Sequence, residues 1–284
     1  MKRQGRSALV AMLPMYLFTL LFILGPLLYM VALSFMSRSG QWGVSTDLTI
    51  NNFLRIGEPV FLETFWQSVK LAFLSTGFVV LLGYPFGYFM AKLPPKWRGR
   101  AMFMLIVPFW TSALVRLYGW MIMFRANGVL DRFLMWPGLT DTPLKLLYTY
   151  PAVVVGMIYV LLPFMIYSVY TSAEKLDWSC VEAARDLGAT AFQAFRTVSL
   201  PLTAPGLASG VVLTFIPSMG LYFIADLLGG NKIVLVGSII QEQLSRANNP
   251  PFAAALAVVL MLLTSLFLFL YKKITKTSEL EGLI

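Results

Sequence analysis

The chain has 284 residues and a mean hydropathy of +0.75, and only 12% of its residues are charged. A soluble domain of this length would carry roughly 25% charged residues, so the composition indicates an integral membrane protein. The single cysteine, Cys180, excludes an internal disulfide and a cysteine-rich metal cluster. The sequence has no histidine, which removes the commonest general base and metal ligand, and no G-x-x-x-x-G-K-[ST] pattern, so the chain carries no P-loop.

Six apolar stretches are long enough to cross a bilayer, which needs about 20 helical residues each. They cover residues 8–36, 67–91, 101–123, 150–172, 206–227 and 252–271. The first stretch contains Pro14 and Pro26, which predict a kink or an interfacial start. Its basic beginning resembles a signal peptide, but the apolar run is too long for one, so we expect a retained anchor.

The distribution of lysine and arginine predicts the orientation of the chain. With the N-terminus inside, the inner segments hold 13 of these residues and the outer loops hold 7. This bias places both termini in the cytoplasm, and it accounts for the net charge of +9 without any nucleic-acid-binding role. The outer loops, 37–66, 124–149 and 228–251, either form a surface for an external partner or merely reconnect helices.

The polar segment 174–201 lies between the fourth and fifth stretches and is cytoplasmic in this topology. Its first half predicts a helix from Asp177 to about residue 187. Ser179 and Glu182 match a capping box, with Asp177 as a competing N-cap. Gly188 is suited to the left-handed conformation that closes a helix.

The second half of the segment predicts another short helix. Thr190 and Gln193 match a second capping box, and Pro201 is expected to stop the helix. Three apolar residues fall on one face at helical spacing: Phe192, Phe195 and Val198. Residue chemistry alone leaves two interpretations open, which are an amphipathic loop resting on the membrane surface and a docking element for a soluble partner.

The segment also carries a longer pattern, which is E-A-A, three residues, G, nine residues, and an apolar residue before x-L-P. This pattern resembles the EAA loop of ABC-importer permease subunits. The residues to which the resemblance assigns contact with the ATPase are Glu182, Ala183, Ala184, Asp186, Gly188, Leu200 and Pro201. In that family the loop inserts into a groove on a separate ATP-hydrolysing subunit and transmits its closure to the membrane helices.

Further segments resemble the first permease subunit of spermidine/putrescine ABC importers. They are GYPFGYFMAKLP (83–94), LIVPFWTSALVRLYGW (105–120), LLPFMIYSVYTSAEKLD (161–177) and PSMGLYFIADLLGGNK (217–232). The resemblance implies an all-α fold with six transmembrane helices, the type I ABC importer permease (MetI-like) fold. It divides the chain into an N-terminal tail, first helix and external loop (1–66), a permease core (67–272) and a cytoplasmic tail (273–284).

The resemblance also implies partners and leaves the chain without catalysis or a cofactor of its own. The partners are a companion permease subunit, two copies of a cytoplasmic ATPase that uses ATP, and an extracytoplasmic polyamine-binding protein. The protein would then be a multi-pass component of the cytoplasmic membrane that translocates spermidine or putrescine.

A path for a polycation needs negative charge or aromatic faces, because stripping water from an ammonium group is costly. The aromatic candidates in the third and fifth stretches are Trp110, Tyr118, Phe215, Tyr222 and Phe223. The alternative is that they are ordinary interfacial or lipid-facing residues. Asp226 is the best acidic candidate at the outer mouth; its alternatives are interfacial anchoring or pairing with Arg116 or Lys232.

Four other residues are expected to support the structure or to act as a hinge. Arg116 would lie about 22 Å along the third helix, held by carbonyls or an acid. Gly206 and Gly210 form a G-x-x-x-G step for close helix contact, and Pro217 is expected to kink the fifth helix just below Gly220.

Two rival functions remain open at this point. An importer for another small solute shares the same architecture. A stand-alone secondary transporter or channel would need carboxylates within the membrane for a coupling ion, and none lies near the middle of a stretch. A membrane enzyme is disfavoured because histidine, metal clusters and paired carboxylates are absent from the sequence.

Overall fold

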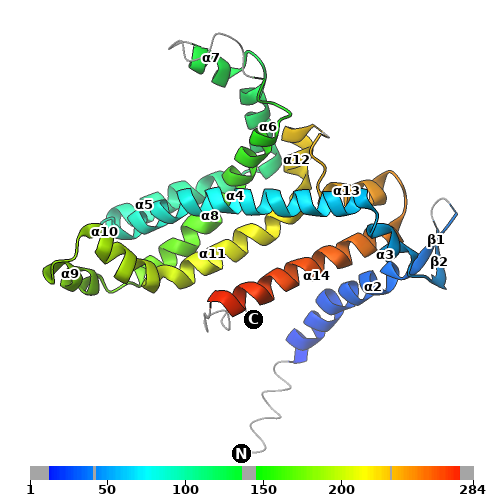
Figure 1. Cartoon of the computed structure of the whole chain (residues 1–284), viewed down its shortest axis with the longest axis horizontal. Coiled ribbons are helices and arrows are strands. Elements are labelled where there is room, and N and C mark those ends of the chain that lie inside the picture. The colour runs from blue at the N-terminus through cyan, green and yellow to red at the C-terminus, as the bar shows by residue number, and fades with distance from the viewer. Residues whose placement is uncertain (1–12, 41–42, 136–144, 231, 276–284) are drawn as a thin grey trace, which may run out of the picture. The chain divides into compact units, whose positions relative to one another are not determined.

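The computed structural model describes residues 13–40, 43–135, 145–230 and 232–275 (Figure 1). It contains two compact units. Unit 1 comprises the residues up to Leu62 together with Ile239–Ser265, and unit 2 comprises Glu63–Ser238 and the residues from Leu266 onward.

The elements follow one another as η1 (Thr19–Leu24), α2 (Gly25–Ser34), β1 (Met36–Ser39), β2 (Gly43–Leu48), α3 (Asn51–Ile56), α4 (Pro59–Lys92), α5 (Pro95–Ile106), η2 (Val107–Trp110), α6 (Ala113–Phe124), α7 (Val129–Met135), α8 (Tyr150–Glu174), α9 (Trp178–Asp186), α10 (Ala191–Ala194), η3 (Phe195–Ser199), α11 (Leu200–Gly220), α12 (Tyr222–Gly229), α13 (Val236–Ser245) and α14 (Pro250–Thr275).

Within the described residues, five helices are long and apolar enough to cross a membrane. They are Leu13–Ser34, Pro59–Lys92, Tyr150–Glu174, Ala191–Gly220 and Pro250–Lys273. A sixth span is formed only if the pair Pro95–Trp110 and Ala113–Phe124, which meet at 90°, is counted as one. The expected third span is therefore a broken element rather than one straight helix.

The hydrogen bonds of the first span change from the α-helical to the π-helical pattern just before Pro26. The π-helical turn η1 precedes it, and the Gly25 amide donates to the carbonyl of Leu20, five residues back. Proline has no amide to donate, and its ring crowds the carbonyl four residues earlier, so a wider turn accommodates it inside a continuous helix.

Unit 1 contains a β-hairpin where the sequence indicated only a loop. β1 and β2 pair antiparallel, with a register shift between Met36 and Ser37. The Asn52 side chain of α3 donates to the carbonyls of Ser34 (3.0 Å) and Met36 (2.9 Å), which fixes the end of α2 and the start of β1 together. Asparagine can do this because its amide group carries two donors.

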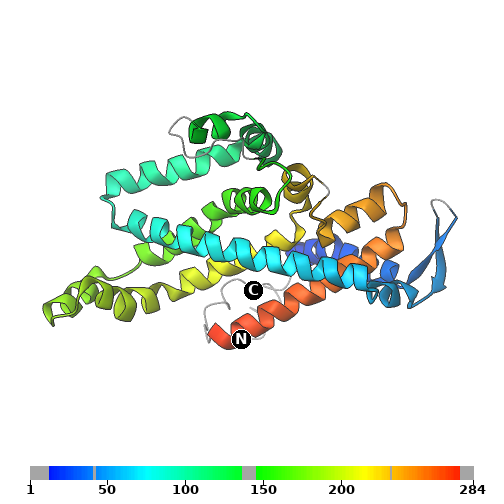
Figure 2. The ribbon, with the colours of Figure 1, turned by 45° about the horizontal axis from the view of Figure 1, so that its top comes forward.

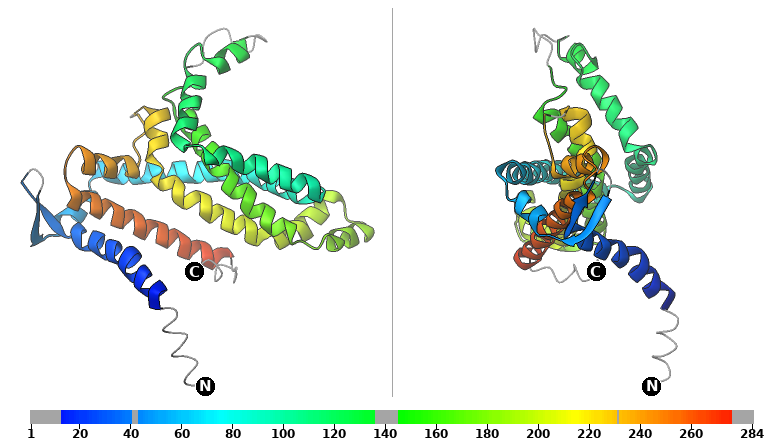
Figure 3. Two further views of the ribbon diagram at one scale, coloured as in Figure 1. Left: turned by 180° about the vertical axis from the view of Figure 1, so that it is seen from behind. Right: turned by 90° about the vertical axis from the view of Figure 1, so that its right-hand side faces the viewer.

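Unit 2 is built on α4, α8 and α11, which lie side by side in several views (Figures 2 and 3). Glycines make the contact close. A Cβ on Gly206 would lie 2.3 Å from the Ser172 Cβ, and one on Gly210 would lie 2.5 Å from the Met165 sulfur. The G-x-x-x-G step therefore packs against α8, as such steps do in membrane helices.

The fifth span also differs from its expected bounds. It begins at α10 and continues through η3 into α11, which ends at Gly220. Leu221 adopts a non-helical conformation and separates α11 from the short helix α12. Pro217 lies inside α11, and its carbonyl accepts a hydrogen bond from the Leu221 amide at 3.0 Å.

Candidate functional site

The segment between α8 and α11 begins with a side-chain cap. Asp177 is the N-cap of α9, and its Oδ1 accepts a hydrogen bond from the Ser179 amide at 3.0 Å. Hydrogen bonds from the Ser179 side chain and backbone lower the pKa of Asp177 below its usual 3.8. The capping box predicted for Ser179 and Glu182 is wrong, because the competing carboxylate makes a charge-assisted bond to the helix start.

The end of α9 is closed by Gly188, as predicted. Gly188 has φ +91°, and its amide donates to the Arg185 carbonyl at 2.9 Å. The Ala189 amide reaches back to the Ala184 carbonyl at 3.1 Å. These two bonds form a Schellman motif, which satisfies carbonyls that would otherwise be left without a donor.

The start of α10 confirms the second capping box. The Thr190 hydroxyl accepts from the Gln193 amide at 3.3 Å, and the Gln193 side chain accepts from the Thr190 amide at 2.8 Å. Residues 187–190 therefore form a turn in which local hydrogen bonds cap both helix ends.

Pro201 does not stop the second helix, contrary to the prediction. The π-helical turn η3 precedes it, and the Leu200 amide donates to the Phe195 carbonyl, five residues back. Pro201 then occupies the first turn of α11, where proline needs no donor. The residues of the predicted apolar face have different surroundings. Phe192 is 70% exposed, whereas Phe195 packs against Tyr84 and Tyr88.

The tip of the segment projects apolar and charged side chains without cover from its own chain. No residue of α9 is buried, and Leu187, directly before the turn, is 90% exposed. Glu182, Ala183 and Asp186 are also exposed. Exposed apolar residues on a locally saturated, rigid turn suit contact with another surface.

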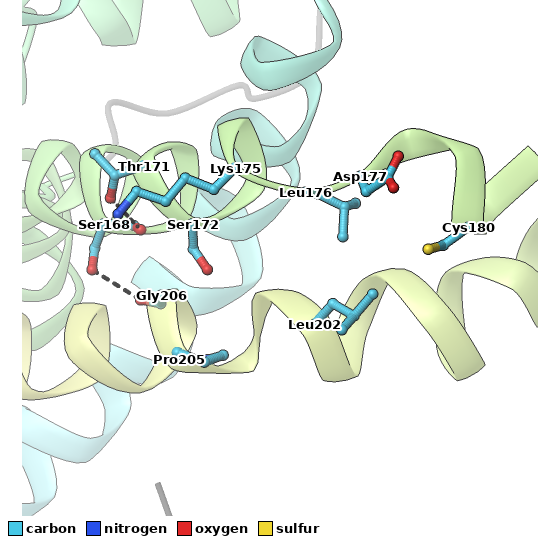
Figure 4. A pocket seen from close by; sticks show the side chains of 10 residues that line it. All are labelled: Ser168, Thr171, Ser172, Lys175, Leu176, Asp177, Cys180, Leu202, Pro205 and Gly206. Atoms are coloured by element: carbon cyan, nitrogen blue, oxygen red, sulfur yellow. Dashed lines mark hydrogen bonds between the residues drawn. The ribbon is translucent and has the colours of Figure 1, made fainter. Parts of the chain in front are cut away.

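A pocket of about 460 Å³ with a mixed polar and apolar lining lies between the end of α8, the start of α9 and α11 (Figure 4). It is lined by Ser168, Thr171, Ser172, Lys175, Leu176, Asp177, Cys180, Leu202, Pro205 and Gly206. The Ser168 hydroxyl donates to the Gly206 carbonyl at 2.9 Å, which joins α8 to α11 at the pocket wall.

Sequence reasoning missed the attachment of this segment to α4. Tyr88 is buried, and its hydroxyl donates to the Ser199 Oγ at 2.8 Å. Its ring lies 5.6 Å from that of Trp178, at the start of α9. The only sequence signal is the spacing of Tyr84 and Tyr88, which puts both on one face of a helix.

The candidates in the broken third span lie on either side of its bend. Trp110 ends η2 and is 75% exposed, and Tyr118 on α6 is half-exposed. Arg116 does not lie 22 Å along one straight helix, because the span is bent before it. Its guanidinium donates to the Pro108 carbonyl and lies 4.4 Å from the Phe109 ring.

The candidates of the fifth span are separated by the break at Leu221. Tyr222 and Asp226 belong to α12 and not to the end of the long span. Asp226 is exposed and accepts a hydrogen bond from the Ser238 hydroxyl at 2.9 Å, so its recorded partner is neither Arg116 nor Lys232. Tyr222 is half-buried beside Phe223, with ring centroids 6.3 Å apart.

Phe215 is wrongly placed among the wall candidates. It is 2% exposed, and its ring stacks on that of Phe267 at 3.8 Å and meets that of Phe73 at 4.8 Å. These contacts make it a core residue of unit 2.

Comparisons with known proteins cover almost the whole chain. Residues 83–277 match the family described as binding-protein-dependent transport system inner membrane component. The chain is 41% identical over 265 residues to the spermidine/putrescine transport system permease protein PotB of Escherichia coli (strain K12), covering 92% of this chain and 96% of that protein. The PotB of Salmonella typhimurium (strain SL1344) is 40% identical over 271 residues, with 95% and 94% covered.

A solved structure shows the same fold. One chain of a bacterial alginate ABC transporter, crystallised in complex with an alginate pentasaccharide-bound periplasmic protein, superposes with a TM-score of 0.75 over 97% of both chains. Its sequence identity is 16%, so this likeness concerns the fold alone. The predicted all-helical permease fold is confirmed, with the hairpin β1–β2 as an addition.

Proposed function

The chain belongs to the family of binding-protein-dependent transport system inner membrane components, and we propose that it translocates spermidine or putrescine across the cytoplasmic membrane. The observation that carries the substrate class is the 41% identity to a spermidine/putrescine permease over nearly the full length of both chains. The chain is a permease subunit and not an enzyme, and ATP is used by a separate subunit.

The proposed coupling site is the segment from α9 to the start of α11, with the α9–α10 turn at its tip. Its residues are Glu182, Ala183, Ala184, Asp186, Gly188, Leu200 and Pro201. Local caps hold the turn rigid, and Leu187 at its tip is 90% exposed, which suits insertion into a groove of a cytoplasmic ATPase dimer. The second helix of the segment runs without interruption into α11, so a push on the turn would reach a membrane span directly.

The complete importer would contain three kinds of partner. They are a companion permease, the two ATPase copies and an extracytoplasmic polyamine-binding protein. In this arrangement both chain termini and the α9–α10 turn face the cytoplasm, as the lysine and arginine bias predicts. The permease core would span residues 67–272, flanked by the segments 1–66 and 273–284.

The proposed path uses aromatic and acidic groups near the broken spans. Trp110 and Tyr118 are exposed on their own chain, so they are available to a substrate or to the companion subunit. Tyr222 and Asp226 sit together on α12, where the carboxylate offers a charge complementary to an ammonium group. Arg116 would support the bend rather than contact a cationic solute, and Gly206, Gly210 and Pro217 would govern packing and motion of α11.

The test is uptake of labelled spermidine and putrescine in cells that lack other polyamine importers and express this chain with its neighbouring subunits. Gly188→Val should strongly lower uptake while the complex still assembles, because only the backbone conformation at Gly188 resists a side chain; an added Cβ would meet nothing within 4 Å.

The outcomes separate the substrate from the mechanism. Absence of polyamine uptake by the intact system would remove the polyamine assignment and leave the permease fold standing. Normal uptake in Gly188→Val would instead contradict the coupling role of the turn.

A further inference from the structure

The sequence GYPFGY at residues 83–88 places two glycines and two tyrosines at four-residue spacing on α4. Each pair therefore shares one face of the helix. The glycines face α8, where a Cβ on Gly87 would lie 2.7 Å from the Ile166 carbonyl oxygen. The tyrosines, Tyr84 and Tyr88, face the segment that carries the α9–α10 turn.

Tyr88 contacts two parts of that segment at once. Its ring lies 5.6 Å from the Trp178 ring at the start of α9 and 5.5 Å from the Phe195 ring at the start of η3. Its hydroxyl donates to the Ser199 Oγ at 2.8 Å, at the end of η3. Tyr88 is 6% exposed, so these contacts are made away from water.

Tyr84 extends the same contact by one helical turn. Its ring meets that of Phe195 at 5.9 Å, and its hydroxyl lies 2.7 Å from the Thr203 Oγ1 on α11. At the other end, the Lys92 ammonium lies 4.6 Å from the Tyr88 ring and 5.2 Å from the Trp178 ring. The aromatic contacts thus run from the last residue of α4 to the first turn of α11.

We propose that Tyr84 and Tyr88, named here the tyrosine clamp, are positioning residues that force α4 to move together with the α9–α10 turn. This inference rests on the proposed function of that turn. α11 follows the turn through the continuous helix, but α5 to α8 lie between α4 and the turn in the sequence. Motion of the turn therefore reaches α4 through packed side chains. The clamp can transmit it because both tyrosines are buried and their hydroxyls bond to Thr203 on α11 and to Ser199 at the end of η3.

The clamp should determine how tightly substrate transport follows ATP hydrolysis. If α4 and α11 move as one body, each closure of the ATPase opens or shuts the path once. If the clamp is loosened, the turn and α11 move while α4 lags, and ATP is hydrolysed without a matching transport event. The clamp residues therefore affect the ratio of substrate transported to ATP hydrolysed, and not merely the amount of complex.

The experiment measures that ratio in the purified four-component importer reconstituted in vesicles, with labelled spermidine as the probe. Tyr88→Leu should keep assembly and ATP hydrolysis but lower the transport ratio by about fivefold, which lies within the range by which mutations in a packed network alter coupling. The matched control is Phe86→Leu, which removes a neighbouring aromatic side chain that is 60% exposed and outside the clamp. Its ratio should stay within about twofold of the intact protein.

If Tyr88→Leu does not assemble, two more conservative variants test whether the clamp affects the transport ratio. Tyr88→Phe and Ser199→Ala each remove one partner of the 2.8 Å hydrogen bond and keep the ring packing. Each single variant should lower the ratio, and the double variant should lower it no further than the worse single one, because the same bond is lost in all three.

The inference and the proposed function fail in different ways. If the intact importer takes up spermidine with ATP, but the clamp variants lose transport only in proportion to ATP hydrolysis, the clamp has no positioning role. If the intact importer shows no uptake driven by ATP, the proposed function itself is wrong, and the inference falls with it.

Discussion

Two changes of chain direction in unit 2 are stabilised in different ways. The α9–α10 turn is held by backbone bonds and small caps, namely the Schellman pair at Gly188 and the capping box at Thr190. The η2–α6 bend is held by one carbonyl, that of Pro108, which accepts from the Thr111 hydroxyl at 2.7 Å and from the Arg116 guanidinium.

The difference has a functional consequence. Because local caps stabilise the α9–α10 turn, the apolar side chains beside it are not needed to hold it, and Leu187 and Phe192 remain exposed for a partner. The η2–α6 bend uses its charged side chain internally: the Arg116 guanidinium donates to the Pro108 carbonyl and lies 4.4 Å from the Phe109 ring. The turn that we propose to dock and the bend that we propose to shape the path thus differ in where their stabilising bonds come from.

The largest effect is expected at the bend. Arg116→Leu removes a charged hydrogen bond and a cation–π contact, which together cost about 2 kcal/mol in the free energy of unfolding. Thermal unfolding of the purified complex measures the loss. Arg116→Lys keeps the charge without the guanidinium fork, so its stability should lie between those of the intact protein and of Arg116→Leu. Unchanged stability combined with an altered preference between spermidine and putrescine would show that Arg116 contacts substrate instead.

The next effect is expected at the turn and depends only on backbone conformation. At Gly188, with φ +91°, a β-branched residue costs about 1–2 kcal/mol, which shifts the balance between the native and opened turn by a factor of about 5–30. Gly188→Val should therefore lower uptake strongly, and Gly188→Asn should lower it less, because asparagine tolerates the left-handed region. Equal uptake by both variants would mean that the turn conformation does not matter for transport.

A smaller effect is expected from Pro217 in α11. Pro217→Ala restores a backbone donor and should stiffen the last turn of the helix before the break at Leu221. Uptake should fall by about fivefold with the amount of assembled complex unchanged. Unchanged uptake would refute the hinge interpretation.

The smallest effect concerns the charge of the α9 cap. Because the pKa of Asp177 is lowered in the folded chain, its stabilising contribution is present above the ordinary value of 3.8 and is lost as the pH falls through the lower folded value. Protection of α9 amides from hydrogen exchange, corrected for intrinsic rates, should be constant above about pH 5 and should drop as the pH is lowered below 3.8. Asp177→Asn should remove this dependence; if the drop persists, another group is responsible.

Features that depend on neighbouring residues were predictable from the sequence. Gly188 and Thr190 were identified correctly because a helix end needs local donors and acceptors, which a few adjacent residues supply. The membrane class and most of the spans followed from hydropathy for the same reason: each apolar run satisfies its own backbone.

Features that depend on distant residues or on altered helical turns were not predictable. The sequence predicts a helix stop at Pro201, but the π-helical turn before it lets the helix continue. The third span breaks at Thr111 and Ser112 with no glycine there to signal it. The tyrosine clamp joins residues 111 and 119 positions apart, a pairing that no local pattern encodes.

The most direct measurement of the central claim asks what the tip of the turn touches. In a Cys180→Ser background, Leu187→Cys provides a single thiol at a position where the native side chain is 90% exposed. A maleimide that carries a short photoreactive group, attached to this thiol in the assembled complex, should on illumination join this position to the ATPase subunit, with a yield that changes when ATP is bound. Reaction of the thiol with a lipid-linked maleimide instead, and no adduct with the ATPase, would show that the turn rests on the membrane surface and would contradict the coupling account.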